Sequence, residues 1–253
     1  MSRYFLELAY KGTAYSGFQV QDNAPTIQSE VEKALQTLFR QTVELTGSSR
    51  TDAGVHANQN FFHFDTEHDI IFKHVYNLNA ILPQDMAVKA IYTVPDSAHC
   101  RFDAIAREYK YFIYSKKNPF LTDCAWLYPY PVNINLLQQA AQILMGYRDF
   151  TSFSKRNTQV NNYQCTLQCS EWGYENELLT YKVKGNRFLR GMVRGLVGTM
   201  LKIGRGQTSI AEFKEIIESL NCTKADFSTP PQGLFLNKVI YKDTLKPFLT
   251  GID

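Results

Sequence analysis

A short polar segment, Gly47-Ser48-Ser49-Arg50-Thr51-Asp52-Ala53-Gly54-Val55-His56, lies between two apolar, strand-like stretches. Asp52 precedes Gly54 by two residues, which favours a tight turn because glycine adopts backbone angles that other residues avoid. Such a turn presents one carboxylate at a sheet edge, where Arg50 and His56 can reach the same pocket. An ordinary turn, in which the aspartate accepts a backbone N–H, explains the segment equally well.

A second segment, Lys182 to Arg205, is strongly basic. It contains no acidic residue and seven basic ones: Lys182, Lys184, Arg187, Arg190, Arg194, Lys202 and Arg205. Helical periodicity predicts a helix over Arg187 to Ile203, with three arginines on one face. Three glycines beside them (Gly191, Gly195, Gly198) would cost about 1 kcal/mol each in a helix interior. Two explanations of this cost are open. The glycines allow the helix to pack tightly on a sheet, or they allow a phosphate backbone or a catalytic loop to lie against the helix.

Composition restricts the class of protein. The chain has 253 residues, 44% of them hydrophobic and 20% charged, as in soluble globular proteins. Residues 1–100 carry 7 basic and 11 acidic side chains and residues 101–253 carry 20 and 13, so the second half is suited to a polyanionic partner. No apolar stretch is as long as a membrane span and no signal peptide is evident, so we expect a cytoplasmic protein.

Cysteines and histidines offer no metal-binding pattern in the sequence. The five cysteines include no Cys-x-x-Cys pair, and the five histidines are scattered without paired ligand spacing. We therefore expect buried thiols in a reducing compartment, no metal site and no cofactor.

Hydrophobic periodicity predicts the same order of strands and helices in each half of the chain. In the first half we predict strands at 3–10, 43–48, 59–65 and 86–93 and helices at 27–40, capped by Thr26, and 71–80. In the second half we predict strands at 108–115, 163–172, 178–184 and 234–241 and helices at 134–145, 187–203 and 210–220. The fold class is therefore α+β, with two ferredoxin-like (split βαβ) subdomains, residues 1–104 and 105–253, that share an extended antiparallel sheet with a central cleft.

The string Arg-Thr-Asp-Ala-Gly-Val-His resembles the active-site signature of the TruA family of tRNA pseudouridine synthases. Further segments resemble the family in order and spacing over nearly the whole chain: Tyr15 to Gln21, Asp96 through Arg101-Phe102, Arg107 to Tyr111, Asp149 to Phe153, Met192 to Arg194, and Pro230 to Leu234. Two residues depart from the family pattern: Ser49 replaces the usual glycine before the arginine, and Phe18 replaces the usual tryptophan.

The resemblance implies a role for each matched residue. Asp52 corresponds to the catalytic aspartate, Tyr109 to a base-stacking tyrosine, and Arg194 to the arginine that pairs with the aspartate. Leu234 would lie under the target ring, and Arg50 would assist nucleotide flipping. More weakly, the basic segment suggests phosphate contacts from Lys184, Arg187 and Arg190.

The resemblance also implies the reaction and the partner. The substrate would be tRNA, with uridines at positions 38 to 40 of the anticodon stem-loop converted to pseudouridine without a cofactor. A homodimer would bind it so that one subunit holds the tRNA body while the other reacts. An isomerase of this kind needs the target base flipped out of its stack and water kept from the intermediate.

Two other classes of protein fit parts of the sequence. A non-catalytic RNA-binding module is one, because paired ferredoxin-like folds often serve as RNA platforms, although Lys184-Gly185-Asn186-Arg187-Phe188 imitates an aromatic RNA-binding string only loosely. An aspartate-based hydrolase is the other. It would need a second carboxylate near Asp52, or a glycine loop for phosphate, and the sequence offers neither clearly.

Overall fold

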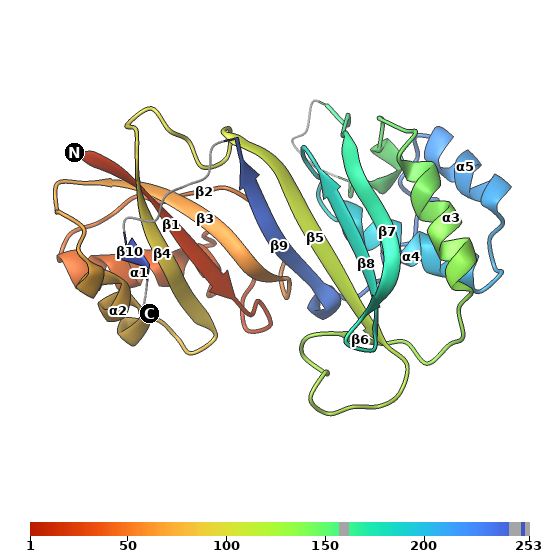
Figure 1. The fold of residues 1–253 in the computed structure, drawn as a ribbon, viewed down its shortest axis with the longest axis horizontal. Coiled ribbons are helices and arrows are strands. Elements are labelled where there is room, and N and C mark those ends of the chain that lie inside the picture. The colour runs from red at the N-terminus through yellow and green to blue at the C-terminus, as the bar shows by residue number, and fades with distance from the viewer. Residues whose placement is uncertain (157–161, 243–248, 251–253) are drawn as a thin grey trace. The chain divides into compact units, whose positions relative to one another are not determined.

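The computed structural model describes residues 1–156, 162–242 and 249–250. The chain forms two compact units (Figure 1): Met1–Ile105 together with Leu236–Asp253, and Ala106–Phe235. Within the described residues, no helix is both long and apolar enough to cross a membrane.

The first unit is an antiparallel sheet covered by helices. The strands β1 (Ser2–Tyr10), β3 (His56–Thr66) and β4 (Met86–Val94) are at its centre, with β1 paired to both neighbours. Short strands β2 (Thr46–Gly47) and β10 (Leu249–Thr250) pair with β3 and β4. Helices α1 (Ile27–Phe39) and α2 (Phe72–Ile81) pack together against this sheet (Figure 1). The last long strand, β9 (Leu234–Tyr241), borders β3 from Leu236 onward.

The second unit repeats this plan. Its strands β5 (Ala104–Tyr114), β8 (Leu178–Gly185) and β7 (Leu167–Glu175) pair antiparallel in that order, and β6 (Trp126–Leu127) runs parallel to β5. Helix α3 (Ile134–Leu144) packs on β7 and on α4 (Met192–Gly204), and α5 (Ile210–Glu218) contacts these two helices (Figure 1). Single-turn 3-10 helices η1 (Thr151–Phe153) and η2 (Pro231–Gly233) complete the described elements.

Local sequence signals explain most of these elements. Helix α1 begins where Thr26 Oγ1 accepts the N–H of Ser29 at 3.2 Å and Ser29 Oγ accepts the N–H of Thr26 at 3.1 Å, a reciprocal cap. Its apolar face is buried as the three- and four-residue spacing predicted. The predicted α+β class is confirmed, and most element bounds agree within two or three residues.

Several predicted elements differ from the structure. The strand expected at 43–48 is reduced to Thr46–Gly47, and the one expected at 163–172 begins only at Leu167. The helix expected from Arg187 begins at Met192, after Gly191 in a left-handed conformation with φ of 73°. The last strand, expected in the subdomain 105–253, belongs with residues 1–105 from Leu236 onward.

Candidate active site

Asp52 lies in a tight turn that its neighbours define. The N–H of Val55 donates to the carbonyl oxygen of Asp52 at 3.1 Å, and Gly54 has φ of 76°, a left-handed angle that favours glycine. The carbonyl of Thr51, one residue earlier, accepts the N–H of Phe18 at 3.1 Å. The Asp52 side chain is half-buried and Arg50 is exposed. The loop therefore carries a half-buried carboxylate and, two residues earlier, an exposed arginine, and their meeting in one pocket stays a prediction.

A buried polar network fixes the backbone that leads to Asp52. Asn60, on β3, is fully buried and donates to the carbonyl of Ser49 at 2.8 Å and to the hydroxyl of Tyr10 at 3.1 Å. The Tyr10 hydroxyl in turn contacts Thr51 Oγ1 at 2.8 Å, and Ser48 Oγ donates to Asn60 Oδ1 at 3.2 Å. Buried polar groups with satisfied hydrogen bonds define one conformation, so the strand β3 positions the loop rigidly.

His56 makes a buried contact with the segment after β1, and its sharing a pocket with Asp52 stays a prediction. Its ring is fully buried and its Nδ1 accepts the N–H of Gly12 at 3.0 Å. A side chain at Gly12 would approach the Val55 carbonyl oxygen within 2.0 Å, so the two segments are in direct contact there. His56 therefore joins the Asp52 loop to the end of β1, which is a structural role.

The two departures from the family pattern fit into the fold. Phe18 is buried, stacks on Phe62 with ring centroids 4.8 Å apart, and lies so close to Gly47 that a Cβ there would be 2.1 Å from the ring. Ser49 is buried, and its hydroxyl contacts that of Ser48 at 3.3 Å. Neither residue displaces a group of the Asp52 loop.

The second unit brings Tyr109, Arg194 and Leu234 into one neighbourhood around Tyr111. Tyr109 and Tyr111 are two residues apart on β5, so their side chains lie on the same face of the sheet. Burial raises the pKa of Tyr111, and the nearby guanidinium of Arg194 opposes that rise. The Tyr111 hydroxyl donates to the carbonyl of Pro230 at 2.7 Å, and its ring covers Gly233, which precedes Leu234.

Each of these residues has a defined environment within the second unit. Arg194 Nε donates to the carbonyl of Thr229 at 2.6 Å, and Thr229 Oγ1 donates to the carbonyl of Arg194 at 3.0 Å. The ring of Tyr109 meets that of Phe188 edge to face, with centroids 5.0 Å apart. Leu234 begins β9 and is buried. The roles assigned to Asp52, Arg50, Tyr109, Arg194 and Leu234, and the pairing of Asp52 with Arg194, stay predictions.

The expected basic helix is organised differently from the sequence-based picture. Arg187 and Arg190 precede α4. Within α4, every residue except Arg194 and Lys202 is buried. A Cβ on Gly195 would be 2.8 Å from the Phe227 ring, and one on Gly198 would be 2.4 Å from the carbonyl oxygen of Asp226. The helical glycines therefore admit a segment of this chain, residues 226–229, that also holds Arg194.

Ion pairs occupy part of the basic segment. Lys182 Nζ is 3.1 Å from a carboxylate oxygen of Glu171, and Lys202 Nζ is 3.1 Å from one of Asp226. Lys184, Arg187 and Arg190, the residues proposed for phosphate contacts, are half-buried, half-buried and exposed respectively. Their phosphate contacts stay a prediction.

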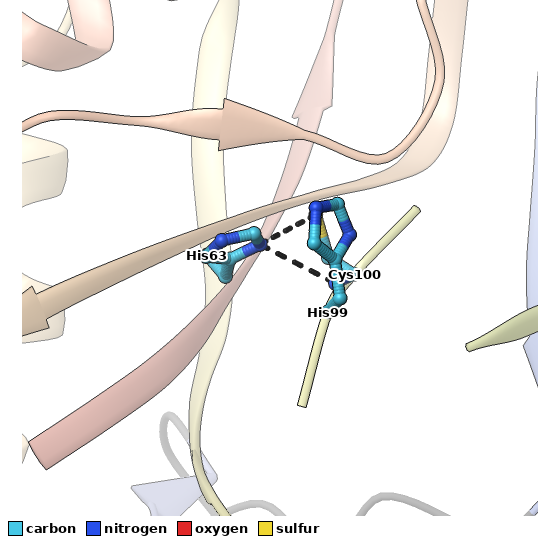
Figure 2. A group of neighbouring side chains, drawn as sticks. All are labelled: His63, His99 and Cys100. Carbon is cyan, nitrogen blue, oxygen red and sulfur yellow. Dashed lines mark hydrogen bonds between the residues drawn. The ribbon is translucent and has the colours of Figure 1, made fainter. Parts of the chain in front are cut away.

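His63, His99 and Cys100 form the one group among the described residues whose ligand atoms are close enough for a metal ion, lying within 4.8 Å of one another (Figure 2). Hydrogen bonds already engage these atoms. The N–H of Cys100 donates to His63 Nδ1 at 3.3 Å, its Sγ donates to the carbonyl of Thr46 at 3.1 Å, and His99 Nδ1 accepts the N–H of Arg101 at 3.2 Å. Burial, and secondarily Arg3, lower the pKa of His63 to about 4, so it is a neutral acceptor at pH 7. The group is explained as an anchor of residues 99–102.

Comparison with known proteins gives one family. The sequence profile described as tRNA pseudouridine synthase matches residues 8–103 and 140–242. A protein of Parabacteroides distasonis named tRNA pseudouridine synthase A is 41% identical over 250 residues, which cover 98% of this chain and 99% of that protein. Proteins of the same name from Bacteroides fragilis and Staphylococcus aureus are 43% and 37% identical, covering 95% and 94% of this chain and 97% and 91% of theirs. The chain belongs to the tRNA pseudouridine synthase family, which confirms the resemblance seen in its sequence.

Sequence reasoning missed the residues that hold the candidate site together. Each of Asn60, Tyr10, Tyr111 and Thr229 makes at least one hydrogen bond with a residue 35 or more positions away. No local spacing indicates such contacts. Tyr111 carried one signal, since it lies two residues after Tyr109 in the resembling motif.

Proposed function

We propose that this protein is a tRNA pseudouridine synthase, an isomerase that converts uridine to pseudouridine in the anticodon stem-loop, at positions 38 to 40. The observation that carries the proposal is the Asp52 turn, held by the buried Asn60 network in a member of this family. A single rigidly held carboxylate is what the chemistry requires, because a flexible one would lose the benefit of orientation.

The reaction conserves every atom of the substrate. The C1′–N1 glycosidic bond breaks, the uracil rotates, and C5 bonds to C1′; C5 loses its proton and N1 ends with one. A glycoside hydrolase commonly uses two carboxylates, one to protonate the leaving group. Uracil leaves as a stabilised anion, so the carboxylate of Asp52 suffices to begin the reaction, and no cofactor takes part.

We assign the remaining residues to binding and charge. In this assignment Arg194 pairs with Asp52, because the planar guanidinium matches the geometry of a carboxylate. Tyr109 stacks on the flipped base and Leu234 lies beneath the target ring. Arg50, exposed on the Asp52 loop, assists the flipping of the nucleotide.

The two units divide the work in this proposal. The first carries the catalytic loop, and the second carries the basic residues Lys184, Arg187 and Arg190 that contact RNA phosphates. The working form is a homodimer in the cytoplasm, in which one subunit holds the body of the tRNA while its partner reacts. No metal ion takes part.

Replacement of Asp52 tests the proposal directly. We expect Asp52→Asn to lower kcat by a factor on the order of 10³ or more while tRNA affinity is kept, because the amide lacks the anionic oxygen and preserves the shape. The assay is incubation with an unmodified tRNA transcript, followed by carbodiimide primer-extension mapping. The matched control is Asp22→Asn, at an exposed aspartate of the same unit, which should leave the rate unchanged.

The same assay separates the competing classes of protein. An RNA-binding module would bind the transcript and produce no pseudouridine with the unmodified protein. An aspartate-based hydrolase would release free uracil or phosphate and leave an altered strand. Either result would contradict an isomerase.

A further inference from the structure

The first unit contains a basic pocket whose lining residues, apart from Arg50, have no part in the proposed reaction. Its volume is about 200 Å³, and its lining includes Arg50, Arg101, Phe102, His99, Gln19 and Gln28. No aspartate or glutamate is among the lining residues, and two arginines are. A pocket of this charge favours an anion, and its volume admits one planar ring with its substituents.

Phe102 gives the pocket an exposed aromatic surface in a fixed orientation. Its ring is 74% exposed, lies 4.2 Å from the ring of His99 at an interplanar angle of 35°, and has the guanidinium carbon of Arg101 5.7 Å from its centroid. Single exposed apolar residues are common and mean little. A largely exposed ring that is oriented by a neighbouring imidazole and guanidinium, at the edge of a pocket lined by glutamine and arginine residues, is suited to stacking with another ring.

Buried hydrogen bonds fix the loop that carries this ring. Figure 2 shows Cys100 bonded to His63 through its backbone N–H and facing it with its sulfur, while His99 lies alongside. Tyr241 donates its hydroxyl to the carbonyl of Cys100 at 2.7 Å, and Asp103 accepts the N–H of His99 at 2.7 Å. Because the loop is ordered before any ligand arrives, binding costs little conformational entropy.

We propose that this pocket binds one nucleotide of the RNA substrate next to the nucleotide that is flipped, with its base stacked on Phe102 and its phosphate near Arg101 and Arg50. The inference rests on the proposed function and deepens it. Arg50 connects the two sites, because it lies two residues before Asp52 and also lines the pocket. A flipped nucleotide leaves a gap in its stack, and stacking of a neighbour on protein offsets part of that loss.

The test measures RNA affinity in the Asp52→Asn background, where conversion does not interfere. Phe102→Ala should weaken binding of an anticodon stem-loop RNA by between about 5-fold and 150-fold, the range for loss of one base–aromatic stack. Phe102→Tyr should retain the affinity, and Phe102→Leu, apolar but unable to stack, should lose it. The control is Tyr174→Ala, at a tyrosine of β7 that is 69% exposed, which should bind like the parent protein.

Every outcome decides the matter. Equal affinity for the leucine and tyrosine variants overturns the proposal, since stacking then contributes nothing, and so does an equal loss from Tyr174→Ala. Melting temperatures of all variants should match, because Phe102 is largely exposed. If the wild-type protein makes no pseudouridine yet Phe102→Leu loses affinity, the proposed reaction is refuted and the nucleotide-binding pocket is supported. If the wild-type protein converts uridine and Phe102→Leu binds RNA normally, the reaction is supported and the pocket is refuted.

Discussion

At the scale of single residues, Asn60 makes the buried hydrogen bonds that fix the loop carrying Asp52. It is fully buried on β3, and its side-chain amide makes hydrogen bonds with the carbonyl of Ser49, the hydroxyl of Tyr10, the hydroxyl of Ser48 and the N–H of Phe61. These partners lie at or near the loop that presents Asp52. If Asp52 is the catalytic residue that we propose, Asn60 is a positioning residue, which acts on the reaction through the shape of the loop.

We expect Asn60→Ala to lower the free energy of unfolding by about 2 to 4 kcal/mol, since it leaves buried polar groups without partners. It should also lower kcat more than it raises KM, because the loop loses its orientation and the RNA contacts remain. Denaturant unfolding and steady-state kinetics measure the two effects. The matched control is Asn58→Ala, on the same strand but exposed, where we expect a change within about 0.5 kcal/mol. Equal unfolding midpoints for the two variants would contradict the role of Asn60.

At the scale of elements, α4 and the segment 226–229 pack closely together and orient Arg194. The glycines of α4 let that segment approach the helix, and Thr229 then accepts the Nε–H of Arg194 at 2.6 Å. Asp226, whose pKa is lowered by Ser228 and Lys202 against the effect of burial, adds an ion pair to Lys202. The backbone cost of glycine in a helix is thus offset by a close contact that orients an arginine.

Gly198→Ala tests this packing. The added methyl group would lie 2.4 Å from the carbonyl oxygen of Asp226, so the segment must move, and we expect a net loss of about 1 to 2 kcal/mol despite the better helix propensity of alanine. We also expect a lower kcat, because Thr229 moves with the segment. Thermal unfolding and the pseudouridine assay measure both. Gly173→Ala is the control, since nothing lies within 4 Å of its added carbon; a Gly198→Ala protein as stable and active as this control would refute the account.

At the scale of the whole molecule, the proposed homodimer can be tested by complementation. In our proposal, one subunit grips the tRNA through Lys184, Arg187 and Arg190 while its partner supplies Asp52. Co-expression of Asp52→Asn with an Arg187→Ala/Arg190→Ala variant should therefore restore activity to about a quarter of the wild-type level, from half of the dimers with one working site each. Each variant alone should be nearly inactive. Activity of the mixture no higher than the mean of the two variants would show that each subunit works by itself.

The sequence by itself determined the local elements and the turn that carries Asp52. Helix α1 follows from its apolar spacing and the Thr26 cap, and the Asp52 turn follows from Gly54, because these signals act over a few residues. Family membership was likewise readable from contiguous motifs such as Arg50 to His56.

Only the tertiary structure decided how these pieces are held. It removed Arg187 and Arg190 from α4 and buried that helix, because residues 226–229 cover its glycines. It assigned β9 from Leu236 onward to the first unit, and it joined His63 to Cys100 and Asn60 to Ser49. Such contacts depend on which distant surfaces fit together and satisfy one another's hydrogen bonds, and local periodicity does not encode that.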